Sequence, residues 1–149
     1  MNKNKSQIVA LALVILIFSG CTSSSEPEIR IENAWGRPSP KVATAGAFYM
    51  LIKNLGAEDD KLIGGESSAC GAVELHESYK TEDGAMGMRP VEGGSINIPA
   101  KDEVELTIGG LHIMCIDKLE EFNNGTLLQL NLNFEKSGEI SIELEIREP

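Results

Sequence analysis

Hydrophobic and polar residues alternate along most of the chain from residue 29 onward. Residues 128–134 place Leu or Phe at every second position, and residues 140–146 do the same with Ile and Leu. Shorter segments with the same period, or with a continuous apolar run, lie at 29–32, 47–52, 73–76, 95–98 and 104–108. Successive side chains of a strand point to opposite faces of its sheet, so a period of two predicts strands. No long segment shows the period of 3.6 residues that is typical of an amphipathic helix.

Glycine, asparagine and proline lie between these segments and predict turns. Three glycine pairs, Gly64-Gly65, Gly93-Gly94 and Gly109-Gly110, are interpreted as turns or bends. A phosphate-binding glycine loop would need a helix to start directly behind it, and the pattern predicts none there. Many short strands joined by turns favour an all-β fold, an immunoglobulin-like Greek-key β-sandwich in which two sheets pack face to face.

The N-terminal segment differs from the rest of the chain. Lys3 and Lys5 precede a continuous apolar segment, residues 8–18, which is shorter than the roughly 20 residues that span a bilayer. This arrangement predicts an export signal. Phe18-Ser19-Gly20-Cys21 then resembles a bacterial lipobox, with Phe in place of the usual Leu. We expect cleavage before Cys21 and lipid modification of that cysteine. The alternative is a plain secretory signal with an incidental cysteine.

The pattern divides the chain into a lipoprotein signal peptide at 1–20, a lipidated cysteine and polar tether at 21–28, and one domain at 29–149. A chain of this length can bury a core without disulfides. Several acyl chains on Cys21 would hold the protein stably on a lipid membrane. We therefore expect an exported, membrane-anchored lipoprotein on the periplasmic or outer cell face. The formal net charge of −10 argues against nucleic acid as a partner.

The chain has two histidines, and methionines lie near both of them. His76 opens a segment that ends in Met86-Gly87-Met88, and His112 lies two residues before Met114. Imidazole nitrogens and thioether sulfurs form a soft ligand set, which suits Cu(I) better than Mg²⁺ or Ca²⁺. A single methionine is usually core filler, and Met50, inside an apolar segment, is interpreted in that way. The coincidence of both histidines with three methionines favours a site of two imidazoles and two or three thioethers.

Strand parity predicts which way the second histidine points. In the strand expected around them, His112 and Met114 share one face, whereas Ile113 and Cys115 share the other, apolar face. We therefore expect the imidazole of His112 and the thioether of Met114 to lie side by side and to point away from the core.

Two cysteines remain if Cys21 carries lipid. Cys70 and Cys115 would lie in an exported domain, where disulfides form. Three states are open to them: free thiols in the core, a disulfide, or metal ligands, and we expect them in that order. Parity turns Cys115 toward the core, and no histidine follows it as one usually does in a blue-copper site.

Four segments together resemble the periplasmic copper chaperone family called PCuAC: Val73–Glu77, Gly84–Val91, Ile98–Ala100 and Gly109–Met114. The hallmark of that family is an ordered His, Met and His-x-Met motif on a cupredoxin-like β-sandwich. The resemblance extends over about residues 29–147, essentially the whole expected domain. Two departures are a slightly longer interval before the second histidine and the pair Lys101-Asp102, where the family often has glycines.

The resemblance implies copper ligands at His76, Met88, His112 and Met114, with Met86 as an additional or alternative sulfur. It also implies Cu(I) binding outside the cytoplasm and delivery of copper toward the CuA centre of cytochrome c oxidase. Subunit II of that oxidase, or another copper chaperone, would be the recipient.

A catalytic role has no support in the pattern, because no nucleophile and base are arranged as in an acyl-transfer triad. We expect a copper-binding metallochaperone and not an enzyme. Two other functions are compatible with the same features. One is a blue-copper-like electron-transfer protein, and the other is a metal-free structural lipoprotein with an immunoglobulin-like sandwich.

Overall fold

The computed structural model describes residues 25–149. The predicted signal peptide, the expected lipidation site at Cys21 and the first part of the tether lie outside the described residues. Residues 25–149 form ten β-strands and one short 3-10 turn, with no α-helix among them. No helix in this part of the chain is long and apolar enough to cross a membrane. The all-β class expected from the period of two is therefore confirmed.

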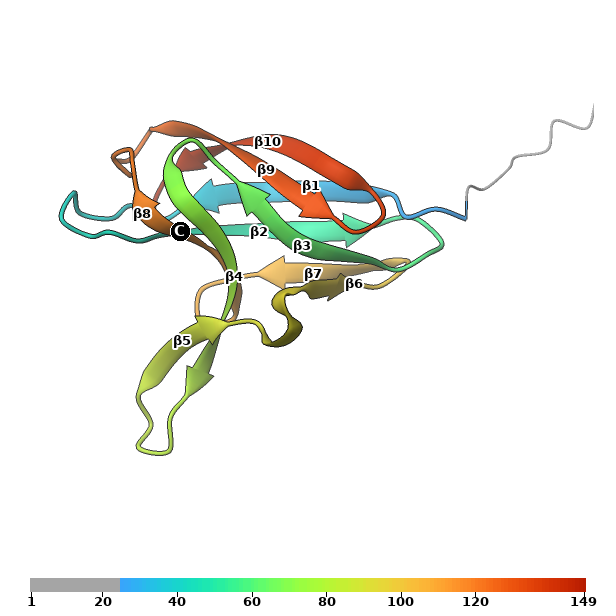
Figure 1. Ribbon diagram of the computed structural model, residues 1–149, viewed down its shortest axis with the longest axis horizontal. Helices are drawn as coiled ribbons and strands as arrows, with labels where there is room; N and C mark the ends of the chain where they lie inside the picture. Colours follow the sequence, from blue (N-terminus) through green and yellow to red (C-terminus); the bar gives the residue numbers. More distant parts are fainter. Residues whose placement is uncertain (1–24) are drawn as a thin grey trace, which may run out of the picture.

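The strands follow the alternating segments of the sequence. Residues 128–134, for example, lie in β9, and residues 140–146 lie in β10. In chain order the elements are β1 (Ile29–Gly36), β2 (Gly46–Asn54), β3 (Asp60–Glu66), β4 (Cys70–Lys80), β5 (Met86–Pro90), the 3-10 turn η1 (Glu92–Gly94), β6 (Ile96–Ile98), β7 (Asp102–Leu106), β8 (Leu111–Lys118), β9 (Leu127–Phe134) and β10 (Gly138–Ile146) (Figure 1).

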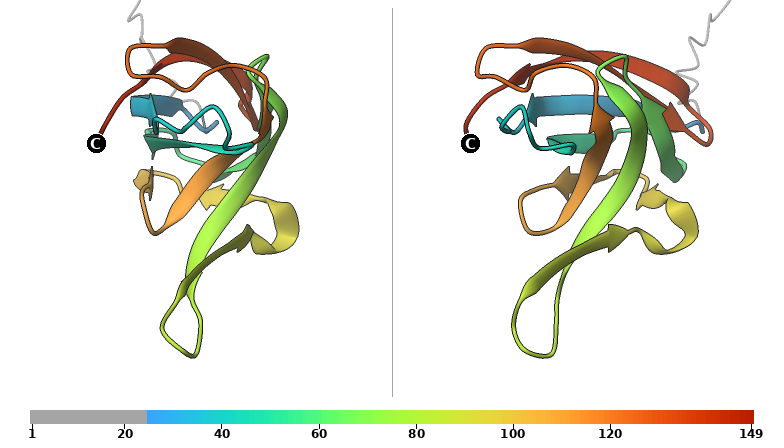
Figure 2. Two further views of the ribbon diagram at one scale, coloured as in Figure 1. Left: turned by 90° about the vertical axis from the view of Figure 1, so that its left-hand side faces the viewer. Right: turned by 60° about the vertical axis from the view of Figure 1, so that its left-hand side comes forward.

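The strands form one sheet that folds over on itself. A hydrogen-bonded path runs in the order β5-β4-β8-β2-β1-β10-β9-β3-β6, and β7 pairs with β2 beside it. All pairings are antiparallel except that of β1 with β10. The path curls so that β1, β2 and β7 form one layer and β9, β3 and β6 the facing layer (Figure 2). This arrangement agrees with the expected β-sandwich.

The core lies between the two layers and is built from every second residue of the strands. Burying one such aliphatic or aromatic side chain contributes about 1.5–3 kcal/mol, so the alternation itself favours the packing of the layers. Met50 has the core role expected from its apolar segment. All ten strands lie within residues 29–146. The buried inward residues of β2 and β9 are Phe48, Met50, Ile52, Leu128, Leu130, Leu132 and Phe134.

Strands β3 and β5 were not predicted by the sequence pattern, and β3 contradicts a specific interpretation. It contains Gly64-Gly65, which we interpreted as a turn. The pair lies instead inside the strand, where the register with β9 shifts between Leu62 and Gly64. A side-chain carbon on Gly65 would lie 2.6 Å from the backbone oxygen of Asn131, so glycine is needed because two backbones approach closely. The turn interpretation was wrong for this pair, whereas the other two glycine pairs lie outside the strands, as expected.

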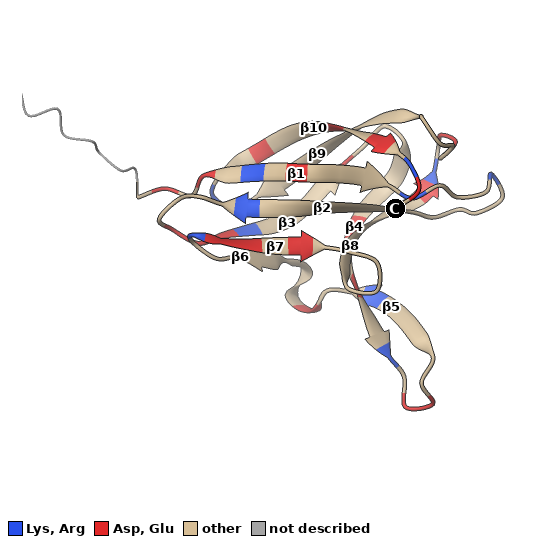
Figure 3. Cartoon of the chain, turned by 180° about the vertical axis from the view of Figure 1, so that it is seen from behind, with Lys and Arg blue, Asp and Glu red and all other residues tan. Residues whose placement is uncertain are grey.

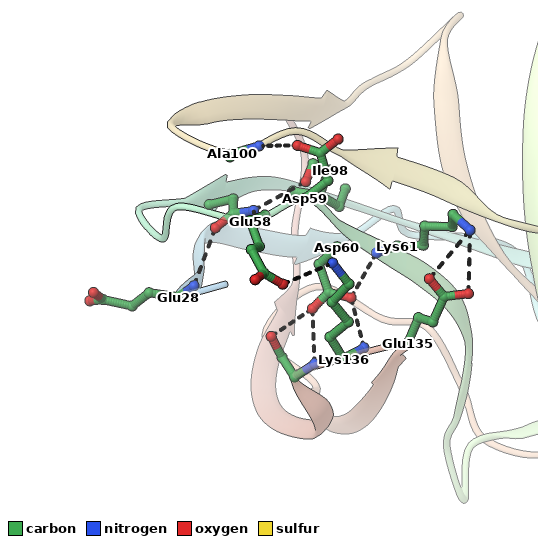
Figure 4. A network of polar contacts seen from close by, with 11 residues as sticks. Glu28, Glu58, Asp59, Asp60, Lys61, Ile98, Ala100, Glu135 and Lys136 are labelled. Atoms are coloured by element: carbon green, nitrogen blue, oxygen red, sulfur yellow. Dashed lines mark hydrogen bonds and ion pairs between the residues drawn. The ribbon is translucent and has the colours of Figure 1, made fainter. Parts of the chain in front are cut away.

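A buried carboxylate holds the turn between β9 and β10 against the start of β3 (Figure 4). Asp60 accepts hydrogen bonds of 2.6–2.9 Å from the backbone N–H groups of Lys61, Lys136 and Ser137 and from the Ser137 hydroxyl. Burial by itself would raise the pKa of Asp60, but these donors outweigh it and lower the pKa below its ordinary value. The ionised carboxylate is therefore part of the folded structure.

Strands β4 and β5 form a hairpin that projects from the body of the domain (Figures 1 and 2). In the sheet path, β5 pairs only with β4. No residue of β5 is buried. The hairpin therefore carries Met86 and Met88 away from the core, whereas the inner part of β4 remains paired with β8.

Candidate metal centre

The pairing of β4 with β8 brings both histidines of the chain together. His76 of β4 lies directly opposite His112 of β8 in the antiparallel register. Residues opposite each other in such a pair point to the same face, with Cβ atoms about 5 Å apart. The two imidazole rings are 5.9 Å apart between centroids and meet edge to face. One site is thus made from two motifs that are distant in the sequence.

Two methionines flank this pair in the register. Met114 of β8 lies opposite Glu74, and Met88 of β5 lies opposite Ser78. Glu74 and Ser78 are each two residues from His76 along β4, one on either side of it. Because side chains two residues apart share a face of the sheet, both thioethers are on the same face as the histidine pair. The register therefore places two sulfurs, from two different strands, on the same face as the two imidazoles.

Met86 lies one step farther toward the tip of the hairpin, opposite Lys80. Residues two positions apart along a strand are about 7 Å apart, so Met86 is more distant from the histidine pair than Met88. The side chains of Met86 and Met88 are 58% and 59% exposed. No group of three or more His, Cys, Asp or Glu side chains that could hold a metal occurs within residues 25–149.

The imidazole of His112 is held through one nitrogen and leaves the other unpaired. Its Nδ1 lies 3.0 Å from the backbone oxygen of Gly110. A carbonyl oxygen only accepts hydrogen bonds, so Nδ1 carries the proton and Nε2 has the free lone pair. Nε2 is buried and finds no hydrogen-bond partner in the described part of the chain. Such atoms are uncommon in folded proteins, and a metal ion is one recognised explanation.

The imidazole of His76 has the complementary arrangement. Its Nε2 donates a hydrogen bond to Oε2 of Glu74 at 2.8 Å. The other nitrogen, Nδ1, is buried and has no partner among the described residues. Histidines that bind metals usually donate their second N–H to a carboxylate or a backbone carbonyl, which fixes the tautomer. His76 and His112 show one case of each, and each ring leaves one buried nitrogen without a partner among the described residues.

The burial of His112 differs from the sequence expectation. Parity correctly places Ile113 and Cys115 in the core, where both are fully buried, and His112 on the opposite face. That face is covered at this point, and His112 is only 2% exposed. The ring of Tyr49, from β2, lies 6.3 Å from the imidazole between centroids. His112 does point away from the core, as parity predicts, but it is buried beside the ring of Tyr49 from the neighbouring strand, which parity along one strand does not reveal.

The two cysteines form a disulfide between β4 and β8. Cys70 and Cys115 have Cα atoms 5.3 Å apart and are both buried on the core side of the strand pair. We expected free core thiols first, and that expectation was wrong, because the fold brings the two Cα atoms to 5.3 Å, within the range of a disulfide. Sulfur in a disulfide is no thiolate, so Cys115 does not supply the cysteine ligand that a blue-copper site requires.

Acidic residues lie at the tip of the projecting hairpin (Figure 3). Glu82 and Asp83 belong to its turn. A hydrogen bond from the Thr81 hydroxyl, with further bonds from the backbone, lowers the pKa of Asp83 below its ordinary value. On the face away from the histidines, Arg89 of β5 pairs with Glu77 of β4 at 2.8 Å. The tip of the hairpin is therefore negative, and an ion pair links its two strands.

Three neighbours of the histidines were not assigned a role from the sequence. Glu74 lies two residues before His76 and therefore on the same face of β4, so strand parity could have indicated this contact. Gly110 holds His112 through its backbone oxygen, which the identity of the residue does not reveal. Tyr49 reaches His112 only through the pairing of β2 with β8, and no local pattern indicates that pairing.

Comparison with known proteins agrees with this architecture. Residues 29–146 match the family described as "Putative lipoprotein LpqE-like". A protein of Leifsonia xyli subsp. xyli (strain CTCB07), named "Putative lipoprotein Lxx21020", is 25% identical over 148 residues, which cover 93% of this chain and 87% of the relative.

Two solved structures have the same fold. The apo PCuAC domain from PmoF1 aligns with a TM-score of 0.67 and 26% identity, over 81% of this chain and 94% of that domain. The copper-bound PCuAC domain from PmoF2 aligns with a TM-score of 0.66 and 27% identity, over 81% of this chain and 93% of that domain. The cupredoxin-like β-sandwich implied by the resemblance to PCuAC proteins is thereby confirmed. Because the match to the family covers nearly the whole described domain, the chain belongs to the LpqE-like family.

Proposed function

We propose that this protein is an extracytoplasmic metallochaperone that binds Cu(I) between His76, His112, Met114 and Met88. The observation that carries the proposal is the pair of buried, unpaired nitrogens, Nδ1 of His76 and Nε2 of His112, on rings that face each other. The second nitrogen of each ring already has a partner, which leaves the first for a metal ion. The copper-bound state of the PmoF2 domain, which has the same fold, supports the choice of metal.

The donor set fits Cu(I) chemically. Thioether sulfur and neutral imidazole are soft or intermediate ligands and bind Cu(I) in preference to hard cations. Thioethers do not titrate, so binding through them releases no protons. Met88 is the better ligand candidate of the hairpin because the register puts it nearer to the histidine pair than Met86. Met86 would serve as a second sulfur near the tip when copper leaves.

The two kinds of ligand differ in access to solvent. His112 is buried, whereas Met88 lies on an exposed strand that pairs only with β4. A partner protein can therefore replace the outer sulfur first and the imidazoles afterwards, which allows direct transfer of copper. The protein binds and passes on the ion and catalyses no reaction. We propose the CuA centre of cytochrome c oxidase subunit II, or another copper chaperone, as the recipient.

Export and membrane attachment complete the proposal. Residues 1–20 serve as the signal peptide, Cys21 carries the lipid, residues 21–28 form the tether and residues 29–149 form the copper-binding domain. The description of the matching family as a lipoprotein supports this division. Metabolic labelling with a fatty acid tests it: the native chain should incorporate label and sediment with membranes, and Cys21→Ala should do neither. A native chain that is released without label would contradict lipidation.

The metal proposal is tested by an anaerobic Cu(I) titration of residues 22–149 in competition with a chromophoric Cu(I) chelator. One equivalent should be bound tightly by the native domain and lost in the double variant His112→Ala/Met114→Ala. Met50→Leu is the matched control, because this methionine lies in the core and its loss should leave binding intact. Failure of the native domain to compete would overturn the Cu(I) assignment. An intense visible thiolate band with Cu(II) would instead indicate a blue-copper protein.

A further inference from the structure

Four rings form one row across the outer face of the sheet. His76 of β4 lies opposite His112 of β8, and Tyr49 of β2 lies opposite Trp35 of β1. The pairing of β2 with β8 ends at Phe48 opposite Ile113, which makes Tyr49 and His112 the next residues of the row. Successive ring centroids are 5.9, 6.3 and 4.7 Å apart from His76 to Trp35. His112 thus lies between the other candidate ligand, His76, and the rings of Tyr49 and Trp35, which we call the aromatic wall.

The far end of the row is anchored. Tyr49 is only 6% exposed and packs on Trp35, which is partly buried. The guanidinium of Arg147 lies over the Trp35 ring, 5.2 Å from its centroid. Aromatic pairs and cation–π contacts of this kind restrict the motion of the rings involved. Tyr49 therefore has a fixed position from which to contact His112.

The two histidines are held in different ways. His76 is held by a side-chain carboxylate, that of Glu74. Among the described residues, His112 has a single hydrogen-bond partner, the backbone oxygen of Gly110, and no side chain that holds it. The Tyr49 ring closes the side of the imidazole that faces away from His76. His112 is 2% exposed, and the Tyr49 ring lies beside it at 6.3 Å between centroids.

We propose that Tyr49 is the positioning residue for His112, and that Trp35 holds Tyr49 in place. The aromatic wall keeps Nδ1 of His112 on the Gly110 oxygen and so keeps Nε2 unprotonated and directed toward the ligand site. The role in copper binding rests on the proposed function, whereas the control of the His112 tautomer is a property of the protein without metal.

The metal-free protein provides the first test. The chain has only two histidines, so a long-range ¹H–¹⁵N NMR spectrum of residues 22–149 contains two imidazole patterns. In the native domain His112 should show a pure Nδ1–H tautomer and His76 a pure Nε2–H tautomer. Tyr49→Phe keeps the ring and should preserve both patterns. Tyr49→Leu should give a mixed or broadened pattern for His112 alone, and an unchanged His112 pattern in this variant would overturn the proposal.

Global destabilisation is separated from positioning by a matched control. Phe122 is a buried aromatic residue that packs on Phe48 in the core. Phe122→Leu should lower the thermal stability while leaving the His112 pattern as in the native domain. If Tyr49→Leu does not fold, Trp35→Leu removes only the support behind Tyr49, and the same broadening of His112 is expected. Native patterns in Trp35→Leu would then overturn the proposal.

Copper binding provides the second test. Residues that orient a metal-binding histidine typically change the affinity about 10–100-fold, and we expect a loss of that size for Tyr49→Leu and none for Tyr49→Phe. Equal Cu(I) affinity of Tyr49→Leu and the native domain would contradict the positioning role. Absence of Cu(I) binding by the native domain would instead overturn the proposed function, and the NMR result would still decide whether Tyr49 controls His112.

Discussion

The inner and outer parts of the proposed copper site differ in how firmly the fold holds them. The inner part is His112 with Met114 on β8, where one imidazole nitrogen is bonded, the ring is buried and a disulfide joins the neighbouring strand. The outer part is Met88 on β5, an exposed strand with a single neighbour. Regions with few buried contacts open at low free energy, whereas buried ones do not. The difference suggests that the inner part sets the affinity and the outer part sets the rate of exchange.

Removal of the disulfide tests the rigidity of the inner part and should have the largest effect. Cys70 and Cys115 close a loop with a sequence separation of 45 residues. The double variant Cys70→Ala/Cys115→Ala should lower the free energy of unfolding by about 4 kcal/mol, because the unfolded chain gains loop entropy. Chemical denaturation measures this change. An unchanged denaturation midpoint would mean that the β4–β8 pairing alone holds the inner part together.

Loss of the inner imidazole should abolish tight copper binding. His112→Ala removes a buried residue that we propose as a ligand, and we expect Cu(I) affinity to fall by more than about 100-fold, beyond the range typical of residues that only orient a ligand. Competition with a Cu(I) chelator provides the measurement, and circular dichroism checks that the β-structure persists. Retention of native affinity in a folded variant would remove His112 from the site.

Disruption of the Asp60 network should change stability without changing either part of the copper site. Asp60→Asn removes charge-assisted hydrogen bonds and should lower the free energy of unfolding by about 1–3 kcal/mol at neutral pH, with Cu(I) affinity unchanged. A change in affinity would mean that the two ends of the domain are coupled.

The pH dependence of this effect has a definite sign. The pKa of Asp60 is lowered in the folded state, so its contribution is complete above the unfolded pKa of about 3.9 and is lost as the pH falls through the lower folded-state pKa. The native domain should therefore lose stability below about pH 4 more steeply than Asp60→Asn. Parallel acid-unfolding curves for the two proteins would contradict a stabilising role for the ionised carboxylate of Asp60.

Substitution of the outer sulfurs should have the smallest effect and tests how the outer part of the site differs from the inner part. Met88→Leu should weaken Cu(I) binding about tenfold, mainly through faster release, whereas Met86→Leu should bind nearly as well as the native domain. Stopped-flow transfer to a chelator separates the release rate from the affinity. Equal effects of the two substitutions would mean that the hairpin bends to bring both sulfurs to the histidines.

Much of the fold follows from local pattern. The alternation in residues 128–134 and 140–146 predicted β9 and β10, because the period of side chains on a strand is a property of the strand itself. The same reasoning placed Cys115 on the core side of β8. It failed for β3, where Gly64-Gly65 interrupts the pattern because the backbone of β9 approaches Gly65 closely. The need for glycine at this position comes from β9, so the alternation of residues within β3 does not reveal it.

The candidate site divides in the same way. Its residue types and the His-x-Met spacing come from the sequence, since ligand softness depends on side-chain chemistry and parity on one strand. Four other features depend on which strands pair and in what register. They are the position of His76 opposite His112, the nearer position of Met88, the disulfide between Cys70 and Cys115, and the contact of Tyr49 with His112. These features become visible only in the folded structure, because they join segments whose separation along the chain carries no information about their distance in space.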